Sequence, residues 1–163
     1  LYIMDYNRVL KDESGLTEQE LFERLEKIFD IEKIDAPYYK PTKRHNFGMR
    51  YNKNWFSLSL KPGIVNEDDV IARLDVSILQ QYVLEPLFHI VDPRNDKRID
   101  FVGGIRGIEE LNKRTETDMD VAFSMYPTSM DELISVADAK KLMPPKSTWF
   151  EPKLRSGLFI HKI

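Results

Sequence analysis

Cysteine is absent from the 163 residues of the chain. Its absence excludes disulfide bonds, a thiolate nucleophile and cysteine-ligated metal, and it leads us to expect a reducing compartment, the cytoplasm. Histidine is scarce as well: His45, His89 and His161 lie far apart and lack the spacing of a zinc site. We therefore expect no metal site in this chain and no conventional nucleophile triad, and we expect His89 to pack among its apolar neighbours.

Long apolar runs and a strong excess of one charge are also missing. No stretch approaches the roughly 20 apolar residues of a transmembrane helix, so we expect no membrane partner. The net charge of −3, from 27 acidic and 24 basic residues, argues against a nucleic-acid binder, which would present a basic face. The remaining composition, 42% hydrophobic and 31% charged, is that of an ordinary soluble globular domain.

Two helices have recognisable starts. Thr17 with Glu20, and Ser129 with Glu132, have the spacing of a capping box, in which a hydroxyl and a carboxyl group satisfy the first backbone N–H groups of a helix. We expect the first of these helices to run for about twelve residues, because apolar side chains recur at helical spacing as far as Phe29.

A β-hairpin and a third helix follow from alternation and from proline chemistry. Phe47, Met49 and Tyr51 alternate with other residues, Asn52-Lys53-Asn54 has turn chemistry, and residues 55–60 can return as a second strand, which predicts a hairpin with its turn at these three residues. Asp75 is the predicted N-cap of the third helix. Pro86 lacks a backbone N–H, so we expect it to end or kink that helix near Leu84.

Further strands are predicted at residues 1–10, 99–102 and 119–126, and two more in the closing stretch, joined around residues 152–157. Strands and helices that alternate irregularly, with at least one hairpin, favour an α+β fold with a mixed, largely antiparallel sheet, β-hairpins and three to four packed helices. We expect residues 1–163 to form a single domain. Because the chain begins inside a strand-like stretch, we also expect it to be the C-terminal part of a longer protein.

The closing stretch, residues 143–163, has four basic residues against Glu151 and is locally +3, so the other 142 residues carry −6. Lysine, arginine and hydroxyl side chains beside a glycine turn can hold phosphate or carboxylate. A hairpin whose lysines discourage edge pairing explains the same composition, which leaves both interpretations open. The candidate anion-binding residues are Lys146, Ser147, Thr148, Lys153, Arg155 and Ser156.

Two further positions are second-rank candidates. Gly103, Gly104 and Arg106 follow a predicted strand and precede a helix, and a helix N-terminus there could attract an anion. The turn could equally be structural, since it matches no known phosphate-loop pattern. His45 precedes the hairpin, where it could relay protons, contact phosphate or simply cap the strand entrance.

Several motifs resemble one family. They are Phe47-Gly48-Met49 with Trp55-Phe56-Ser57-Leu58, Leu74-Asp75-Val76-Ser77-Ile78-Leu79, Phe101-Val102-Gly103-Gly104, Ala122-Phe123-Ser124-Met125-Tyr126-Pro127 and Met143-Pro144-Pro145-Lys146-Ser147-Thr148-Trp149-Phe150. The set is similar to the C-terminal portion of the uncharacterised conserved family catalogued as domain of unknown function 1015. Glu151 departs from it, since an aromatic residue is more usual there, and its carboxylate would weaken an anion site by pairing with a lysine.

The resemblance implies a longer full-length protein whose N-terminal half carries an Asp-Gly-His-His-Arg type motif. That motif looks like the one of the partition-protein/sulfiredoxin-like fold, where related proteins include a nucleotide-dependent free-serine kinase, and family members tend to lie near serine-biosynthesis genes. This sequence has no His-His pair, so the resemblance implies that the catalytic motif lies upstream of Leu1.

The leading hypothesis is therefore the C-terminal part of a phosphotransferase-like protein that acts on a small amino-acid-type substrate. Nucleotide and magnesium would serve the full-length protein, and the partners would be a small anionic molecule and the missing N-terminal half. The alternative is a non-catalytic interaction module or homodimer interface, anchored by the aromatic residues Trp55, Phe56, Trp149 and Phe150. The sequence leaves open whether the chain is an enzyme.

Overall fold

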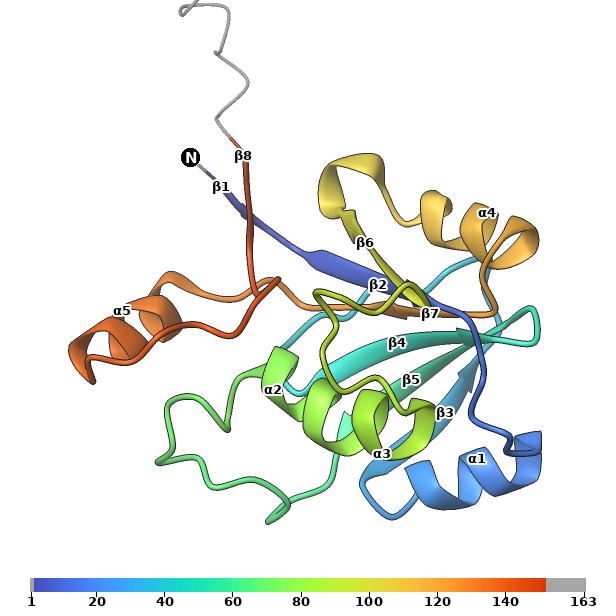
Figure 1. Ribbon diagram of the computed structural model, residues 1–163, viewed down its shortest axis with the longest axis horizontal. Helices are drawn as coiled ribbons and strands as arrows, with labels where there is room; N and C mark the ends of the chain where they lie inside the picture. Colours follow the sequence, from blue (N-terminus) through green and yellow to red (C-terminus); the bar gives the residue numbers. More distant parts are fainter. Residues whose placement is uncertain (1, 152–163) are drawn as a thin grey trace, which may run out of the picture.

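The computed structural model describes residues 2–151, and a six-stranded sheet forms its centre (Figure 1). The strand order is β3-β5-β4-β7-β2-β6, and every pair in it is antiparallel. Outside this sheet, β1 (Tyr2–Met4) pairs antiparallel with β8 (Trp149–Glu151). The six strands are β2 (Tyr6–Leu10), β3 (Phe29–Ile34), β4 (Asn46–Tyr51), β5 (Asn54–Leu60), β6 (Ile99–Gly103) and β7 (Val121–Ser124).

Helices cover both faces of the sheet, which confirms the predicted α+β class (Figure 1). Residues 75–88 form one continuous helical segment, made of α2, a π-helical stretch and α3. A short 3-10 turn, Gly104–Arg106, precedes α4. The helical elements are α1 (Glu18–Leu25), α2 (Asp75–Leu79), the π-helical stretch (Gln80–Leu84), α3 (Glu85–Phe88), α4 (Glu109–Thr117) and α5 (Met130–Asp138).

Alternating side chains along the strands build one apolar cluster on each face of the sheet. On β2, Leu10 packs with α1 and the 75–88 segment, whereas its neighbour Val9 packs with Leu111 of α4. On β7, Phe123 belongs to the same cluster as Leu10, and its neighbour Ala122 belongs to the same cluster as Val9. Successive strand residues point to opposite faces, so one strand supplies both clusters.

The predicted hairpin is confirmed, with a tighter turn than expected. Tyr51 pairs with Asn54, so the turn is formed by Asn52 and Lys53 alone. Both have positive φ, 49° and 66°, as a two-residue turn that matches the strand twist requires.

Both capping boxes are also confirmed. In each, the hydroxyl accepts from the N–H three residues later and the glutamate accepts from the cap N–H. The first helix is shorter than expected. It ends at Leu25 after eight residues, because Phe29 already begins the edge strand β3.

The helix expected to start at Asp75 begins differently from the prediction and continues past Pro86 to Phe88. Its N-cap is Leu74, and Asp75 makes no capping bond, because its carboxylate accepts hydrogen bonds from His45 instead. Pro86 does not end the helix. The hydrogen-bond pattern changes over the π-helical stretch just before it, where the Glu85 N–H bonds to the Gln80 carbonyl. The prediction for His89 is wrong: its side chain is exposed, and its left-handed backbone ends α3.

Within residues 2–151, no helix is both long and apolar enough to cross a bilayer.

Gly48, at the centre of the sheet, tests this packing. A Cβ there would lie 2.9 Å from the Tyr39 carbonyl oxygen and still closer to Ser124 Oγ. We expect Gly48→Ala to lower the free energy of unfolding by about 1–3 kcal/mol, as overpacking does. In a Ser124→Ala background the loss should be smaller, because the nearest clashing atom is gone. Urea denaturation of the four variants measures this, and equal losses in both backgrounds would contradict it.

Candidate functional site

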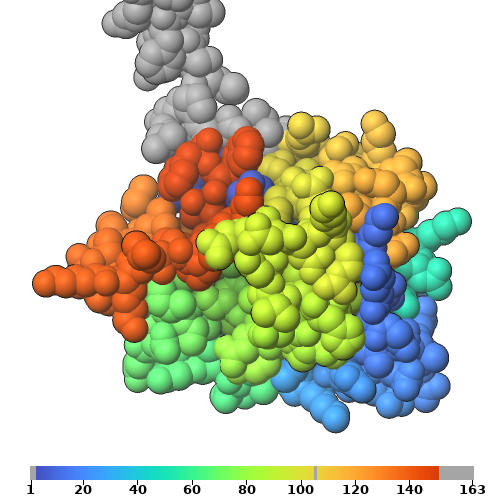
Figure 2. Space-filling model, in the orientation of Figure 1, coloured from blue at the N-terminus to red at the C-terminus, as the bar shows by residue number. Residues whose placement is uncertain are grey.

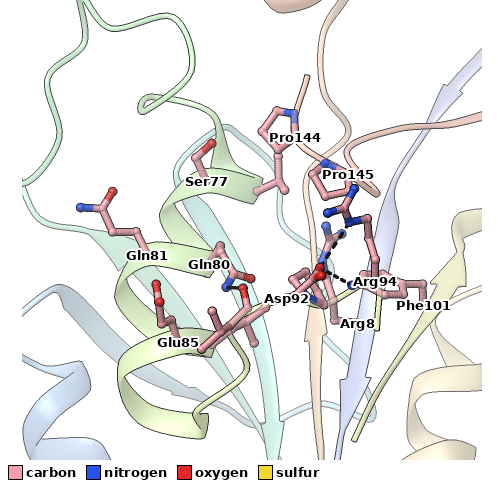
Figure 3. Close-up of a pocket in the computed structure, with 14 residues that line it drawn as sticks. Arg8, Ser77, Gln80, Gln81, Glu85, Asp92, Arg94, Phe101, Pro144 and Pro145 are labelled. Carbon is pink, nitrogen blue, oxygen red and sulfur yellow. Dashed lines mark hydrogen bonds and ion pairs between the residues drawn. The ribbon is translucent and has the colours of Figure 1, made fainter. Parts of the chain in front are cut away.

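A pocket of about 610 Å³ opens between the 75–88 helical segment and the edge of the sheet that β2 and β6 form (Figure 3). Ser77 and Gln80 line it from the helix, and Arg8 and Phe101 line it from β2 and β6. Figure 3 shows Pro144 and Pro145 across one end of the pocket. The closing stretch therefore contributes a wall of this pocket through the two prolines before Lys146.

Arg8 is the unusual residue of this pocket, because it is only 3% exposed and carries a charge. Its guanidinium donates to the Tyr6 carbonyl and, at 2.6 Å, to the Lys146 carbonyl. No ion pair joins it to another described side chain. Burial lowers the pKa of Arg8 to about 10, opposed by the neighbouring Tyr6, so the group stays protonated at neutral pH. A buried cation without a counter-ion is costly, and an anion in the pocket would relieve that cost.

Lys146 brings a second positive charge to the same place. Its ammonium lies 5.8 Å and 5.4 Å from the ring centres of Tyr6 and Phe101. The Arg8 guanidinium lies 5.9 Å and 5.1 Å from the same two rings. Two cations thus share two aromatic rings, each gaining some cation–π stabilisation. Lys146 is exposed and does not line the pocket itself, so its charge lies beside the pocket, next to Arg8 and Phe101, which do line it.

The other predicted residues of the closing stretch are less directly involved. Ser147 donates its hydroxyl to the Pro144 carbonyl, and its own carbonyl accepts from Thr128 Oγ1 at 3.2 Å, so it shapes the loop. Thr148 is half-buried. Lys153, Arg155 and Ser156, together with the second predicted strand of this stretch, lie outside the described residues.

Protein side chains pack closely on the glycine turn. The Trp149 ring covers Gly103, where a Cβ would lie 2.8 Å from the indole. The Asp5 carboxylate lies against Gly104, whose N–H donates to the Asp5 carbonyl at 2.9 Å. These two glycines therefore serve close packing, and a carboxylate stands where a phosphate would approach.

Arg106, from the same turn, points to a different place. It is exposed, with a weak contact to Glu110 at 3.9 Å.

His45 is the centre of a polar cluster on another side of the fold. It has positive φ, 67°, and its backbone N–H donates to both oxygens of Asp75 at 3.0 and 3.1 Å. Its Nδ1 lies 2.8 Å from Asp75 Oδ1, and its Nε2 lies 2.8 Å from Glu67 Oε2. Each ring nitrogen therefore faces a carboxylate, which favours the protonated imidazolium.

Burial and hydrogen bonding shift the pKa values of His45 and Asp75. The hydrogen bond to Asp75 is the main cause that raises the pKa of His45, with Glu67 adding to it and burial opposing it. Burial raises the pKa of Asp75, while the hydrogen bonds from His45 pull it back. Sequence reasoning named His45 but not Asp75, which it used as a helix cap. It missed Arg8, because nothing in a strand sequence marks an arginine that tertiary packing buries.

The raised pKa of His45 makes stability depend on pH. Its contribution should be fully present below the unfolded value of 6.5 and be lost as pH rises through the folded pKa. We expect NMR titration of the ring to give a pKa above 6.5. Asp75→Asn should lower it more than Glu67→Gln, because Asp75 supplies the larger effect. A reversed order would contradict the assigned cause.

Comparison with known protein families gives a match over the first part of the chain. Residues 1–77 match the model of the family described as "Protein of unknown function (DUF1015)", which confirms the predicted resemblance over that part of the chain. No curated protein matches the chain.

Solved structures with a similar fold include two complexes of mutants of a free serine kinase. The complex with AMP has a TM-score of 0.52 and 13% identity, and the match covers 90% of this chain and 52% of that one. The complex with ADP has a TM-score of 0.52 and 14% identity, covering 91% and 53%. A conserved hypothetical protein from Pyrococcus furiosus has a TM-score of 0.51 and 15% identity, covering 90% and 54%. The chain thus spans about half the length of these structures, and at such identities the likeness concerns the fold alone.

Proposed function

We propose that this chain, whose residues 1–77 match the model of the DUF1015 family of proteins of unknown function, is the C-terminal part of a cytoplasmic, phosphotransferase-like protein. The substrate in this proposal is a small hydroxy amino acid, which would connect the protein to serine metabolism. The fold shared with a free serine kinase that binds AMP or ADP supports this choice of reaction class.

The observation that carries the proposal is the buried Arg8 with Lys146 beside it at the pocket. Phosphoryl transfer depends chiefly on holding and neutralising anionic oxygens. A guanidinium and an ammonium donate charge-assisted hydrogen bonds to phosphate or carboxylate oxygens. Arg8, at 3% exposure, also holds its position firmly, because its guanidinium is tied to two backbone carbonyls.

The roles divide as follows in this proposal. Arg8 in the pocket and Lys146 beside it hold the anionic group of substrate or nucleotide. Lys153, Arg155, Ser156, Ser147 and Thr148 remain candidate contributors to anion binding in this proposal. The bound nucleotide and magnesium supply the phosphoryl group and its charge neutralisation, and the catalytic motif belongs to the part of the protein upstream of Leu1.

A thermal-shift titration tests this function. ADP or serine at about a hundred times its dissociation constant should stabilise the full-length protein by roughly 2.7 kcal/mol. Lys146→Ala should weaken the binding of ADP or serine by about tenfold or more, as the loss of one charge-assisted hydrogen bond does. Arg8→Lys keeps the charge but loses the forked donors, and should also weaken binding.

The matched control is Lys33→Ala, an exposed lysine on β3 that is not among the residues lining the pocket. It should leave the affinity unchanged. If Lys146→Ala and Arg8→Lys bind both ligands as tightly as the parent protein, the proposal is wrong.

Exposed apolar side chains on and after α5 favour an interaction module as the second candidate. Met130 and Ile134 are one helical turn apart and about half exposed, and Leu142 is 90% exposed. Figure 2 shows the orange surface around α5 standing out at the margin of the molecule. The prediction that Trp55 is an aromatic anchor of an interface is wrong, because its side chain is buried and its indole N–H donates to Asn112 Oδ1. Sedimentation at micromolar concentration tests self-association, and a monomer would count against a homodimer.

A further inference from the structure

The carboxylate of Glu67 is held like a bound ligand. Its Oε2 lies 2.8 Å from His45 Nε2, and its Oε1 lies 3.5 Å from Arg44 Nη2. Arg44 Nη2 is itself 3.4 Å from His45 Nε2, so both cationic groups face one point. The backbone carbonyl of Glu67 accepts from Arg73 Nη1 at 3.0 Å. One cationic group for each carboxylate oxygen is an arrangement that proteins use to recognise carboxylates and phosphates.

The cationic side of this arrangement is firmly built. Asp75, buried at the start of α2, accepts from the backbone and the ring of His45 and so directs Nε2 outward. Glu132 of α5, also buried, lies 3.2 Å from Arg44 Nε. Two separate parts of the fold, the start of α2 and α5, therefore orient the two donors before any ligand arrives.

Glu67, in contrast, is weakly held. Its side chain is 55% exposed, against 21% for His45, and it belongs to a segment between β5 and α2 that has no helix or strand. Ion pairs with one partner so exposed are worth little, about 0–1 kcal/mol. The Glu67 carboxylate can leave while the donors stay.

The charge balance favours an anion in its place. Without Glu67, the cluster contains Arg44, Arg73 and protonated His45 against Asp75 and Glu132, a sum of +1. Arg73 Nε is buried and has no hydrogen-bond partner among the described residues, so a donor is also left over.

We propose that Arg44 and His45 form a binding site for an external oxyanion, a phosphate or phosphomonoester, and that Glu67 is the internal carboxylate that this anion displaces. The site shares no residue with the pocket of Arg8, and the inference is independent of the proposed function. Binding requires the protonated imidazole, because a neutral ring that donates from Nδ1 to Asp75 leaves only an acceptor at Nε2. The charged groups that face the ring are Asp75 from α2, Glu67 from the segment before it and Arg44 from the entrance of β4. Behind them, Arg73 donates to the Glu67 carbonyl and Glu132 of α5 pairs with Arg44.

Titration of the chain with inorganic phosphate at pH 6.5, followed by NMR of the histidine rings, tests the proposal. Phosphate should shift the ring signals of His45 and leave those of the exposed His89 in place. Glu67→Gln should tighten phosphate binding by about two- to fivefold, the change expected on removing a competing pair of up to about 1 kcal/mol. His45→Gln should abolish binding at this site.

The control is Glu116→Gln, whose side chain is also 55% exposed and also pairs with an arginine, Arg50. It should leave phosphate affinity unchanged. Sulfate, whose charge is constant over this range, should bind more weakly as pH rises through the pKa of His45. Glycerol phosphate that binds more tightly than inorganic phosphate would assign a phosphomonoester, and the reverse would assign the free ion.

Three results would overturn the proposal. The first is an unchanged or weaker affinity in Glu67→Gln. The second is an equal gain in Glu116→Gln, which would make the effect one of net charge alone. The third is a phosphate titration that leaves the His45 signals unmoved in the folded parent chain, a result that does not depend on whether any variant folds.

Discussion

Both candidate sites depend on a four-residue strand. β7, buried at all four positions, pairs with β2 on one side and with β4 on the other, so Phe123 lies opposite both Arg8 and Met49. Without these backbone hydrogen bonds the sheet would be two separate pieces, β3-β5-β4 and β2-β6. Phe123 also meets Phe88 of α3 edge to face, with ring centres 6.4 Å apart. The strand therefore fixes Arg8 on β2 relative to His45 at the entrance of β4, and both relative to the helical segment that begins at Asp75.

The two sites treat buried charge in opposite ways. Around His45, the imidazole and Arg44 each face carboxylates, and the carboxylates raise the pKa of the ring. Around Arg8, backbone carbonyls are the acceptors, and burial lowers the pKa of the guanidinium. A paired cluster is stable alone and can exchange one exposed member, Glu67. A buried cation that forms no ion pair with a side chain of residues 2–151 gains from a ligand, because carbonyl dipoles offset the desolvation of a full charge only in part.

Features that depend on neighbours in sequence were predicted well. The capping boxes at Thr17 and Ser129 and the hairpin turn at Asn52 involve residues within three or four positions, where backbone geometry leaves few choices. Predictions failed where a distant residue offered a better partner. Asp75 has the chemistry of a helix cap, but His45, thirty positions earlier, donates to it from both backbone and ring. Pro86 was expected to end or kink its helix near Leu84, but the helix continues to Phe88, with a π-helical stretch directly before Glu85.

By itself the sequence determined the α+β class, the family resemblance and the basic character of the closing stretch, because each of these is written in short patterns and local charge. Only the tertiary structure decided which charges would be buried and which would meet. Lys146 was evident as a cation, but its meeting with Arg8 over the rings of Tyr6 and Phe101 joins residues 138 positions apart. Burial and pairing of charge depend on which strands lie side by side, and that order is set by the packing of the whole sheet rather than by any one segment.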